Sequence, residues 1–432
     1  MISRRQNAPG NAWPVSAGLT MVEMLVAMTA SLVLLGAVTA VFQVMGDAVA
    51  ASRRLGWLDQ QLDTVITRLM LDLHGATADA DPNGLKVASE TQNGYFEIVE
   101  GPSTDYEDYS TGTRIDRSTA AAPANRSDDR IVGDVDDMLF FTTVTVTPEL
   151  FVGKWQTQND TAETAEVAYF CRPTPNTSNP QLYTLYRRQV LVRGLTPLPP
   201  FTPDGTYPGA PGTTPVNWSA PAAAWQAFYQ NFDVSVRRQG SVFVLNGLDE
   251  LQRRQNRLAH DLVLNTNASP PPVAVPIAAG NPALALLGPR EGEDVLLTNV
   301  LAFDVRVLDP DVVIHRQGAV RLTPSDPGYW AAAAMPLRGP QYVDLGYGHS
   351  LAANAPEHSR FSRLGPAVSP GNPVHPLKAP NAAAPRTFDT WSSLDGPAPY
   401  AESLPGISVT VRLYDPAARR VRQATLNHVF SR

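Results

Sequence analysis

The stretch Gly18–Met28, with the sequence GLTMVEMLVAM, begins an apolar run that decides how the rest of the chain is arranged. From Met24 to Gly46 no residue is charged. A run of this length suits an α-helix that crosses a hydrocarbon core of about 30 Å at about 1.5 Å per residue. The sequence therefore predicts one membrane-spanning helix with a single carboxylate, Glu23, at its start.

The segment before this helix, residues 1–18, is hydrophilic and contains Arg4 and Arg5 but no acidic residue. A conventional secretory signal places its apolar region before the cleavage site, whereas here the apolar run follows Gly18. Basic residues on the N-terminal side favour a cytoplasmic N-terminus. We therefore expect 1–18 to be a leader, and the bulk of the chain to be exported across the membrane.

A basic leader, a Gly, a hydrophobic residue and a Glu at the fifth position after the Gly, followed by an apolar helix, resemble the prepilins of the bacterial type IV pilin-like family. The resemblance implies cleavage between Gly18 and Leu19 by a prepilin peptidase on the cytoplasmic side, and N-methylation of Leu19. Family members more often carry a Phe-Thr-Leu-Ile-Glu run here. The Leu-Thr-Met-Val-Glu of this chain is a conservative departure that bears on the efficiency of methylation.

Glu23 has a physical interpretation of its own. A charged group inside lipid costs about 2.5–3.5 kcal/mol on insertion scales and persists when it has a partner. If cleavage frees a charged amine at Leu19, that amine and Glu23 of a neighbouring subunit can neutralise each other during assembly. The alternative is that Glu23 lies in the headgroup region of a simple membrane anchor and faces water.

The helical pattern continues beyond the apolar run. Leucine, valine and isoleucine recur at spacings of three and four, which predicts one apolar stripe on a helix: Leu55, Leu58, Leu62, Val65, Ile66, Leu69 and Leu73. Gly75 is a suitable C-terminal stop. We expect one helix from about Leu19 to about His74, with a transmembrane half at 19–46 and an amphipathic half at 47–75.

The rest of the chain alternates apolar and polar residues over short runs, as in Leu301–Val307 and Ile407–Leu413, which predicts strands. Proline-rich segments such as Pro366–Pro385 interrupt these runs, because proline cannot donate to a ladder. The predicted fold class is α+β and pilin-like, with a long N-terminal helix packed on an antiparallel sheet. Its expected parts are a β-rich head at 76–317, a Pro-rich insertion at 318–399 and C-terminal strands at 400–432.

Several segments are similar to PilW-type minor pilins and to J-type pseudopilins of type II secretion. They are the helix from Gln60 to Leu73, the Tyr-rich strand Tyr183–Arg187 and the run Leu404–Val411. The resemblance implies a filament subunit, and the large head suits a tip or priming position. The implied partners are the prepilin peptidase, other pilin or pseudopilin subunits, an inner-membrane assembly platform and the lipid bilayer.

The net charge and the cysteine content limit which further functions and bonds are expected. The net charge is −7, so no nucleic-acid-binding surface is expected. The single cysteine, Cys171, excludes an intramolecular disulfide, and we expect it to act as a small apolar residue in a strand.

Two acidic segments are candidates for metal binding. Asp79, Asp81 and Asn83, with Gly84 and Glu90, match the spacing of a twelve-residue calcium loop, but a plain helix-to-strand turn is the preferred interpretation. A second group lacks such spacing and is predicted to be a solvated loop edge: Asp128, Asp129, Asp134, Asp136 and Asp137.

No catalytic motif, phosphate-binding glycine loop or His-Glu-x-x-His motif is present, and His349, His358 and His375 are interpreted as exposed loop residues. We therefore predict no catalytic residue, no cofactor and no metal ion. The predicted function is a minor pilin or pseudopilin anchored by one span in the bacterial inner membrane. The alternative is a single-span membrane-anchored binding or adhesin-like protein. An enzyme tethered by the same helix is a third hypothesis.

Overall fold

The computed structural model describes residues 20–78, 94–100, 107–108, 113–114, 134–177, 182–194, 201–202, 204–207, 221–260, 286–323, 337–345, 361, 386–390 and 404–430. The leader, Gly18, Leu19 and the loop from Asp79 to Glu90 lie outside these residues, as do His349, His358, His375 and most of the Pro-rich segments. The chain separates into two compact units, Met1–Trp57 and Leu58–Arg432.

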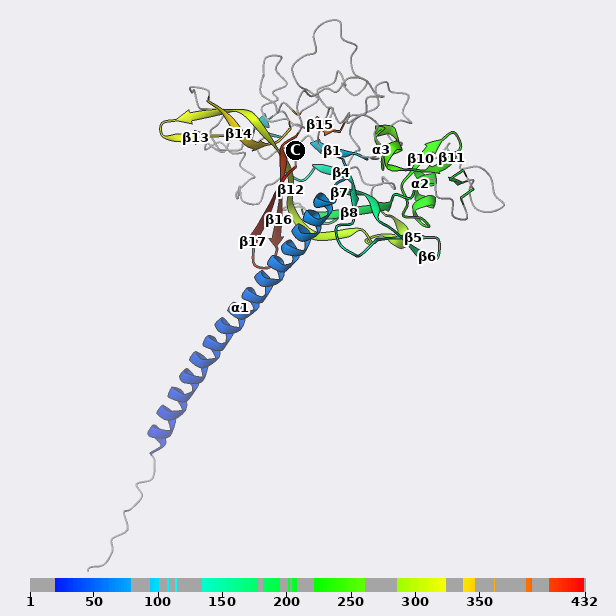
Figure 1. Ribbon diagram of the computed structural model, residues 1–432. Helices are drawn as coiled ribbons and strands as arrows, with labels where there is room; N and C mark the ends of the chain where they lie inside the picture. Colours follow the sequence, from blue (N-terminus) through cyan, green and yellow to red (C-terminus); the bar gives the residue numbers. More distant parts are fainter. Residues whose placement is uncertain are drawn as a thin grey trace, which may run out of the picture. The chain divides into compact units, whose positions relative to one another are not determined.

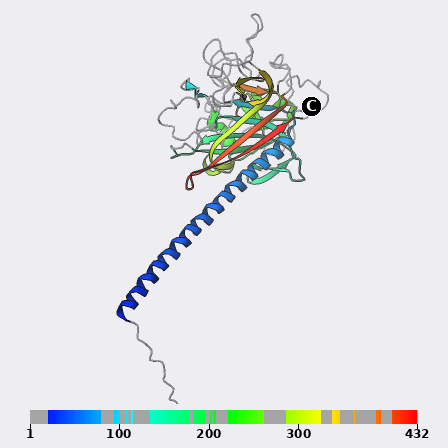
Figure 2. The same cartoon turned by 90° about the vertical axis from the view of Figure 1, so that its left-hand side faces the viewer.

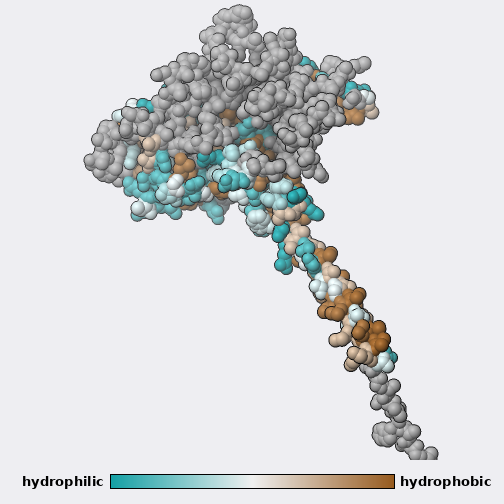
Figure 3. Space-filling model, turned by 180° about the vertical axis from the view of Figure 1, so that it is seen from behind, coloured by the Kyte–Doolittle hydropathy of each residue, from teal (hydrophilic) through white to brown (hydrophobic). Residues whose placement is uncertain are grey.

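Helix α1 extends over Met21–His74, within two residues of the expected bounds. In the first unit its apolar side chains are exposed, and they form the brown surface of the helix in Figure 3. Within the described residues, α1 is the one helix long and apolar enough to cross a membrane. The predicted N-terminal apolar helix is therefore confirmed.

In the second unit, α1 buries the predicted stripe. Its buried apolar residues are Leu58, Leu62, Val65, Leu69 and Leu73. The helix ends where Gly75 meets strand β4 (Met138–Val144), because the Gly75 carbonyl accepts a hydrogen bond from Val144 N at 2.8 Å. A Cβ atom at Gly75 would lie 2.0 Å from the Val144 carbonyl oxygen. Glycine is thus required here for close approach of a strand.

The main sheet is antiparallel and has the order β15-β1-β4-β7-β8-β12-β16-β17 (Figures 1 and 2). Its other strands are β1 (Phe96–Glu100), β7 (Thr164–Pro173), β8 (Tyr183–Leu191), β12 (Val295–Gln317), β15 (Arg386–Asp389), β16 (Gly406–Asp415) and β17 (Arg420–Val429). Strands β13 (Val320–Leu322) and β14 (Leu337–Val343) also pair with β12. The predicted α+β class is confirmed at this level.

Strand β12 is long enough to have several partners in succession. On one edge, Val300–Val307 pairs with β16. On the other edge, β8 pairs with Val295–Val300 and β14 pairs with Val307–Ile314. Between these two partners, Phe303 N donates to the Asp134 carbonyl at 2.8 Å. The residues that precede β4 therefore occupy the gap that β8 and β14 leave along β12.

A smaller layer of helices and strands packs beside β8. It contains β5 (Phe151–Trp155), β6 (Gln158–Ala162), β9 (Thr206–Tyr207), α2 (Pro221–Tyr229), β10 (Val236–Gln239), β11 (Val242–Leu245) and α3 (Leu248–Leu251). The short pair β2 (Glu107–Asp108) and β3 (Thr113–Arg114) lies apart from these sheets in the pairing order. Ring contacts among Phe201, Phe228 and Phe232 form part of the core of this layer.

A buried ion cluster joins this layer to the main sheet. Asp233 accepts hydrogen bonds from Arg188 Nη1 at 2.8 Å and Arg290 Nη2 at 2.8 Å, and from the Lys154 amide at 2.9 Å. Burial alone raises the pKa of Asp233, but the two guanidinium groups outweigh it and the pKa lies below its usual value.

The strands differ from expectation in one region. The predicted strand runs all contain strands, but the range 318–399 was expected only as a Pro-rich insertion. Its described parts include β13, β14 and β15, and the last of these pairs with β1. Each is at most seven residues long, and β14 includes Gly339 and Pro340, so its sequence lacks a simple alternation.

Candidate metal centre and neighbouring sites

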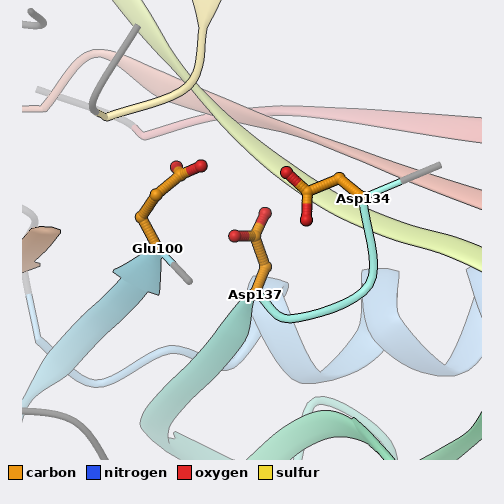
Figure 4. A group of neighbouring side chains, drawn as sticks. All are labelled: Glu100, Asp134 and Asp137. Atoms are coloured by element: carbon orange, nitrogen blue, oxygen red, sulfur yellow. The ribbon is translucent and has the colours of Figure 1, made fainter. Parts of the chain in front are cut away.

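Three carboxylates from distant parts of the sequence meet at one end of the β1–β4 pair. Glu100 is the last residue of β1, and Asp134 and Asp137 directly precede β4. Because Val99 is paired with Met138 in antiparallel register, Glu100 and Asp137 are cross-strand neighbours. One carboxylate oxygen from each of Glu100, Asp134 and Asp137 lies within 4.8 Å of the others, and Figure 4 shows the three groups pointing toward a common space.

All three side chains are buried, since Glu100 is 0 % and Asp134 and Asp137 are each 1 % exposed. Backbone amides supply hydrogen bonds to each. Glu100 Oε2 accepts from Leu345 N at 3.0 Å, Asp137 Oδ2 from Val305 N at 2.7 Å, and Asp134 Oδ1 from Asp136 N at 3.4 Å. The second oxygen of Asp134, Oδ2, is buried and has no hydrogen-bond partner.

Burial and the mutual proximity of these carboxyl groups shift their pKa values. Burial raises the pKa of Asp134 well above its usual value, and the nearby Asp137 carboxylate raises it further. Burial likewise raises the pKa of Asp137, with the largest charge contribution from Asp304. Arg306 on β12 forms ion pairs with Asp304 at 2.8 Å and Asp344 at 3.1 Å. The carboxyl groups of Glu100, Asp134 and Asp137 therefore lie close together where solvent does not screen them from one another, while Arg306 pairs with Asp304 and Asp344.

This result corrects the sequence interpretation of the acidic segment. Asp134 and Asp137 were predicted at a solvated loop edge, but both are buried against β12. Asp128 and Asp129 lie outside the described residues. The signal was missed because the third member, Glu100, lies more than thirty positions earlier and reaches the site only through strand pairing.

At the start of α1, Glu23 takes part in a capping box. Thr20 N and Thr20 Oγ1 donate to Glu23 Oε2 at 2.8 and 2.9 Å, and Glu23 N donates to Thr20 Oγ1 at 3.3 Å. This reciprocal arrangement satisfies amides that the first helical turn leaves without partners. Within the described residues Glu23 is exposed, and its Oε1 atom accepts no hydrogen bond.

Near the end of α1, Asp72 attaches the helix to the sheet. Arg187 of β8 donates to it through Nε at 2.6 Å and Nη2 at 3.0 Å, and Tyr169 of β7 donates its hydroxyl hydrogen. Arg68, one turn earlier, contacts the same carboxylate at 3.3 Å. Asp72 is 2 % exposed, so a bidentate ion pair lies inside the helix–sheet interface.

A further polar network lies beneath β1 and β7. Glu166 accepts hydrogen bonds from Tyr95, Ser235 and the Leu258 amide. Arg257 Nη1 donates to Glu97 at 2.8 Å, and its guanidinium lies 4.3 Å from the centre of the Tyr95 ring.

Each of these groups is buried and engaged with a neighbour. The network therefore ties the turn at 257–260 to the sheet, and its Ser235 and His260 side chains are at most 7 % exposed. Cys171 is fully buried in β7, as expected for a small apolar residue, and burial raises the pKa of its thiol.

Comparison with known proteins yields no relative: no protein-family model, curated protein or solved structure matches the chain.

Proposed function

We propose that this chain is a minor pilin-like or pseudopilin-like subunit, cleaved between Gly18 and Leu19, methylated at Leu19 and assembled into an inner-membrane-based filament. Its expected partners are a prepilin peptidase, other subunits of the same kind and an assembly platform in the membrane. In this proposal the N-terminus starts in the cytoplasm and the head lies outside the cytoplasmic membrane.

The observation that carries the proposal is the division of α1 into two chemically different parts. The apolar side chains between Met21 and Val49 are exposed, for example Leu25, Val33 and Phe42 at 61–74 %, while the stripe from Leu58 to Leu73 is buried on the sheet. A helix that uses only its second part in its own fold offers the first part to lipid or to neighbouring helices.

The geometry of Glu23 is compatible with a role in assembly. Both Thr20 hydrogen bonds use Oε2, so Oε1 is available to the amine of a neighbouring subunit. A pair between that amine and Glu23 removes two charges from lipid together, which favours correct register over other arrangements.

The test separates helix capping from intersubunit pairing. Glu23→Gln keeps a side chain that caps the helix but removes its charge, whereas Thr20→Ala removes the cap and keeps the charge. After co-production with a prepilin peptidase, we expect mass spectrometry to find Leu19 as a methylated N-terminus. We expect Glu23→Gln to lower recovery in sheared or cross-linked filaments at least about tenfold, since one unpaired charge costs more than about 1.4 kcal/mol.

Thr20→Ala is expected to retain most of that recovery. Equal losses for the two variants would assign Glu23 to capping alone. An uncleaved Met1 would refute the filament proposal and favour the membrane-anchored binding protein.

A further inference from the structure

We propose that Glu100, Asp134 and Asp137 bind one Ca²⁺ ion in the gap that β8 and β14 leave along β12. This site is separate from the Asp79–Glu90 segment, and it does not depend on the filament role of the chain.

The first argument is distance. Two oxygens that each lie about 2.4 Å from one calcium ion are at most about 4.8 Å apart, when they sit on opposite sides of it. The chosen oxygens of Glu100, Asp134 and Asp137 lie within 4.8 Å of one another. The three groups are thus close enough to share one calcium ion, and their carboxylates converge on one space (Figure 4).

The second argument is the state of Asp134. Its side chain is 1 % exposed, and Oδ2 has no hydrogen-bond partner. Asp134 also forms no ion pair with any described residue. A buried carboxylate oxygen without a donor is strongly unfavourable unless a cation or proton compensates it.

The third argument is the donor set. All three candidate ligands are carboxylate oxygens, which suit hard divalent cations and not the softer metals that select nitrogen or sulfur. Carboxylates bind calcium through one or both oxygens, so three of them supply three to six ligands. Magnesium requires a near-ideal octahedron at about 2.0–2.1 Å and gives up its bound waters reluctantly, so a site as deeply buried as this one favours calcium.

A bound ion at this place would join four segments. Glu100 ends β1, Asp134 and Asp137 precede β4, Asp137 accepts from Val305 of β12, and Glu100 accepts from Leu345 after β14. Calcium would therefore hold the two parts of the sheet together at the position where ordinary strand pairing is interrupted.

The experiment is a calcium titration of the full-length protein in detergent after treatment with EDTA, followed by thermal unfolding. CaCl₂ should raise the melting temperature by about 5–10 °C at a hundredfold excess over the dissociation constant, and MgCl₂ should raise it less. Isothermal titration should give one calcium ion per chain. Absence of any shift at millimolar CaCl₂ overturns the proposal.

Variants of the candidate ligands test where the calcium ion binds. Asp134→Asn should abolish the calcium-dependent shift, because a neutral amide replaces one of the three carboxylate ligands. Glu100→Gln serves as a second variant with the same expected loss of calcium response. Asp81→Asn, in the other acidic segment, is the matched control and should keep the full shift. If the shift survives Asp134→Asn and Glu100→Gln but disappears in Asp81→Asn, the ion binds at the other segment and the proposal is wrong.

Discussion

Removal of the Asp72 carboxylate tests how α1 is attached to the sheet. In Asp72→Ala, Arg187 loses both hydrogen bonds to Asp72, at 2.6 and 3.0 Å, keeps those to Gln189 and Tyr169, and remains 11 % exposed at the interface. Breaking a buried ion pair on one side costs about 3–5 kcal/mol, because the remaining charge has no counter-charge and little water. With a urea dependence of about 3 kcal/mol per molar, the unfolding midpoint should fall by about 1–1.7 M.

The assay is urea unfolding of the full-length protein in detergent, followed by tryptophan fluorescence; Trp225 is 2 % exposed and reports on the head. Asp59→Ala is the matched control on the same helix. Its contact with Arg422 is 3.3 Å long between side chains that are 53 % and 41 % exposed, so its loss should cost less than about 1 kcal/mol.

A double variant, Asp72→Leu with Arg187→Met, should be more stable than Asp72→Ala, since no isolated charge remains in the interface. Two results would refute the reasoning. One is a midpoint for Asp72→Ala equal to that of Asp59→Ala. The other is a double variant that is no more stable than the single one.

Two other variants test the head. Gly75→Ala should destabilise the head by about 1–3 kcal/mol in urea unfolding, since the new Cβ would lie 2.0 Å from the Val144 carbonyl oxygen. The control Gly56→Ala, whose Cβ would have no atom within 4 Å, should be neutral or slightly stabilising. Equal effects of the two variants would contradict this account. Asp233→Asn should cost about 3–5 kcal/mol near pH 7, because the buried Arg188 loses its ion pair and Arg290 keeps only the one with the half-exposed Glu293. Because the pKa of Asp233 is lower in the folded protein than the unfolded value of about 3.9, the ionised carboxylate stabilises the fold fully above that pH. This stabilisation is lost as the pH falls through the folded pKa, so the stabilities of the wild type and the variant should converge in acid. A difference that stays constant down to about pH 2 would assign the effect of Asp233 to packing.

The predictions that the structure confirms rest on patterns among residues that are close together in the sequence. The stripe from Leu58 to Leu73 repeats every three to four residues, and this period reports the buried face of a helix directly. The alternation in Leu301–Val307 and Ile407–Leu413 likewise identified β12 and β16. Gly75 was predicted to end the helix, and the helix does end beside it, although the physical reason is the approach of β4 and not a left-handed backbone.

Contacts between distant segments escaped prediction. Glu100 and Asp137 become neighbours only through the register of β1 and β4, and Asp72 meets Arg187 from 115 positions away. In neither pair does the sequence spacing around one residue indicate which residue is its partner. The acidic segment was judged by its internal spacing alone, which describes calcium loops but not sites assembled between strands.

The pairing of β1 with β15 has a consequence for the order in which the head is completed. Phe96 N donates to Thr390 Oγ1 at 2.9 Å across 294 positions of sequence. During synthesis, β1 is among the first strands made, and its outer edge has no partner until Arg386–Asp389 follows. An open strand edge invites pairing with other chains, and such distant contacts form slowly. The main sheet is thus completed by one of the last strands to be synthesised. A chain that stops before Arg386 would leave the edge of β1 unpaired and prone to aggregation, whereas in the full chain β15 covers it.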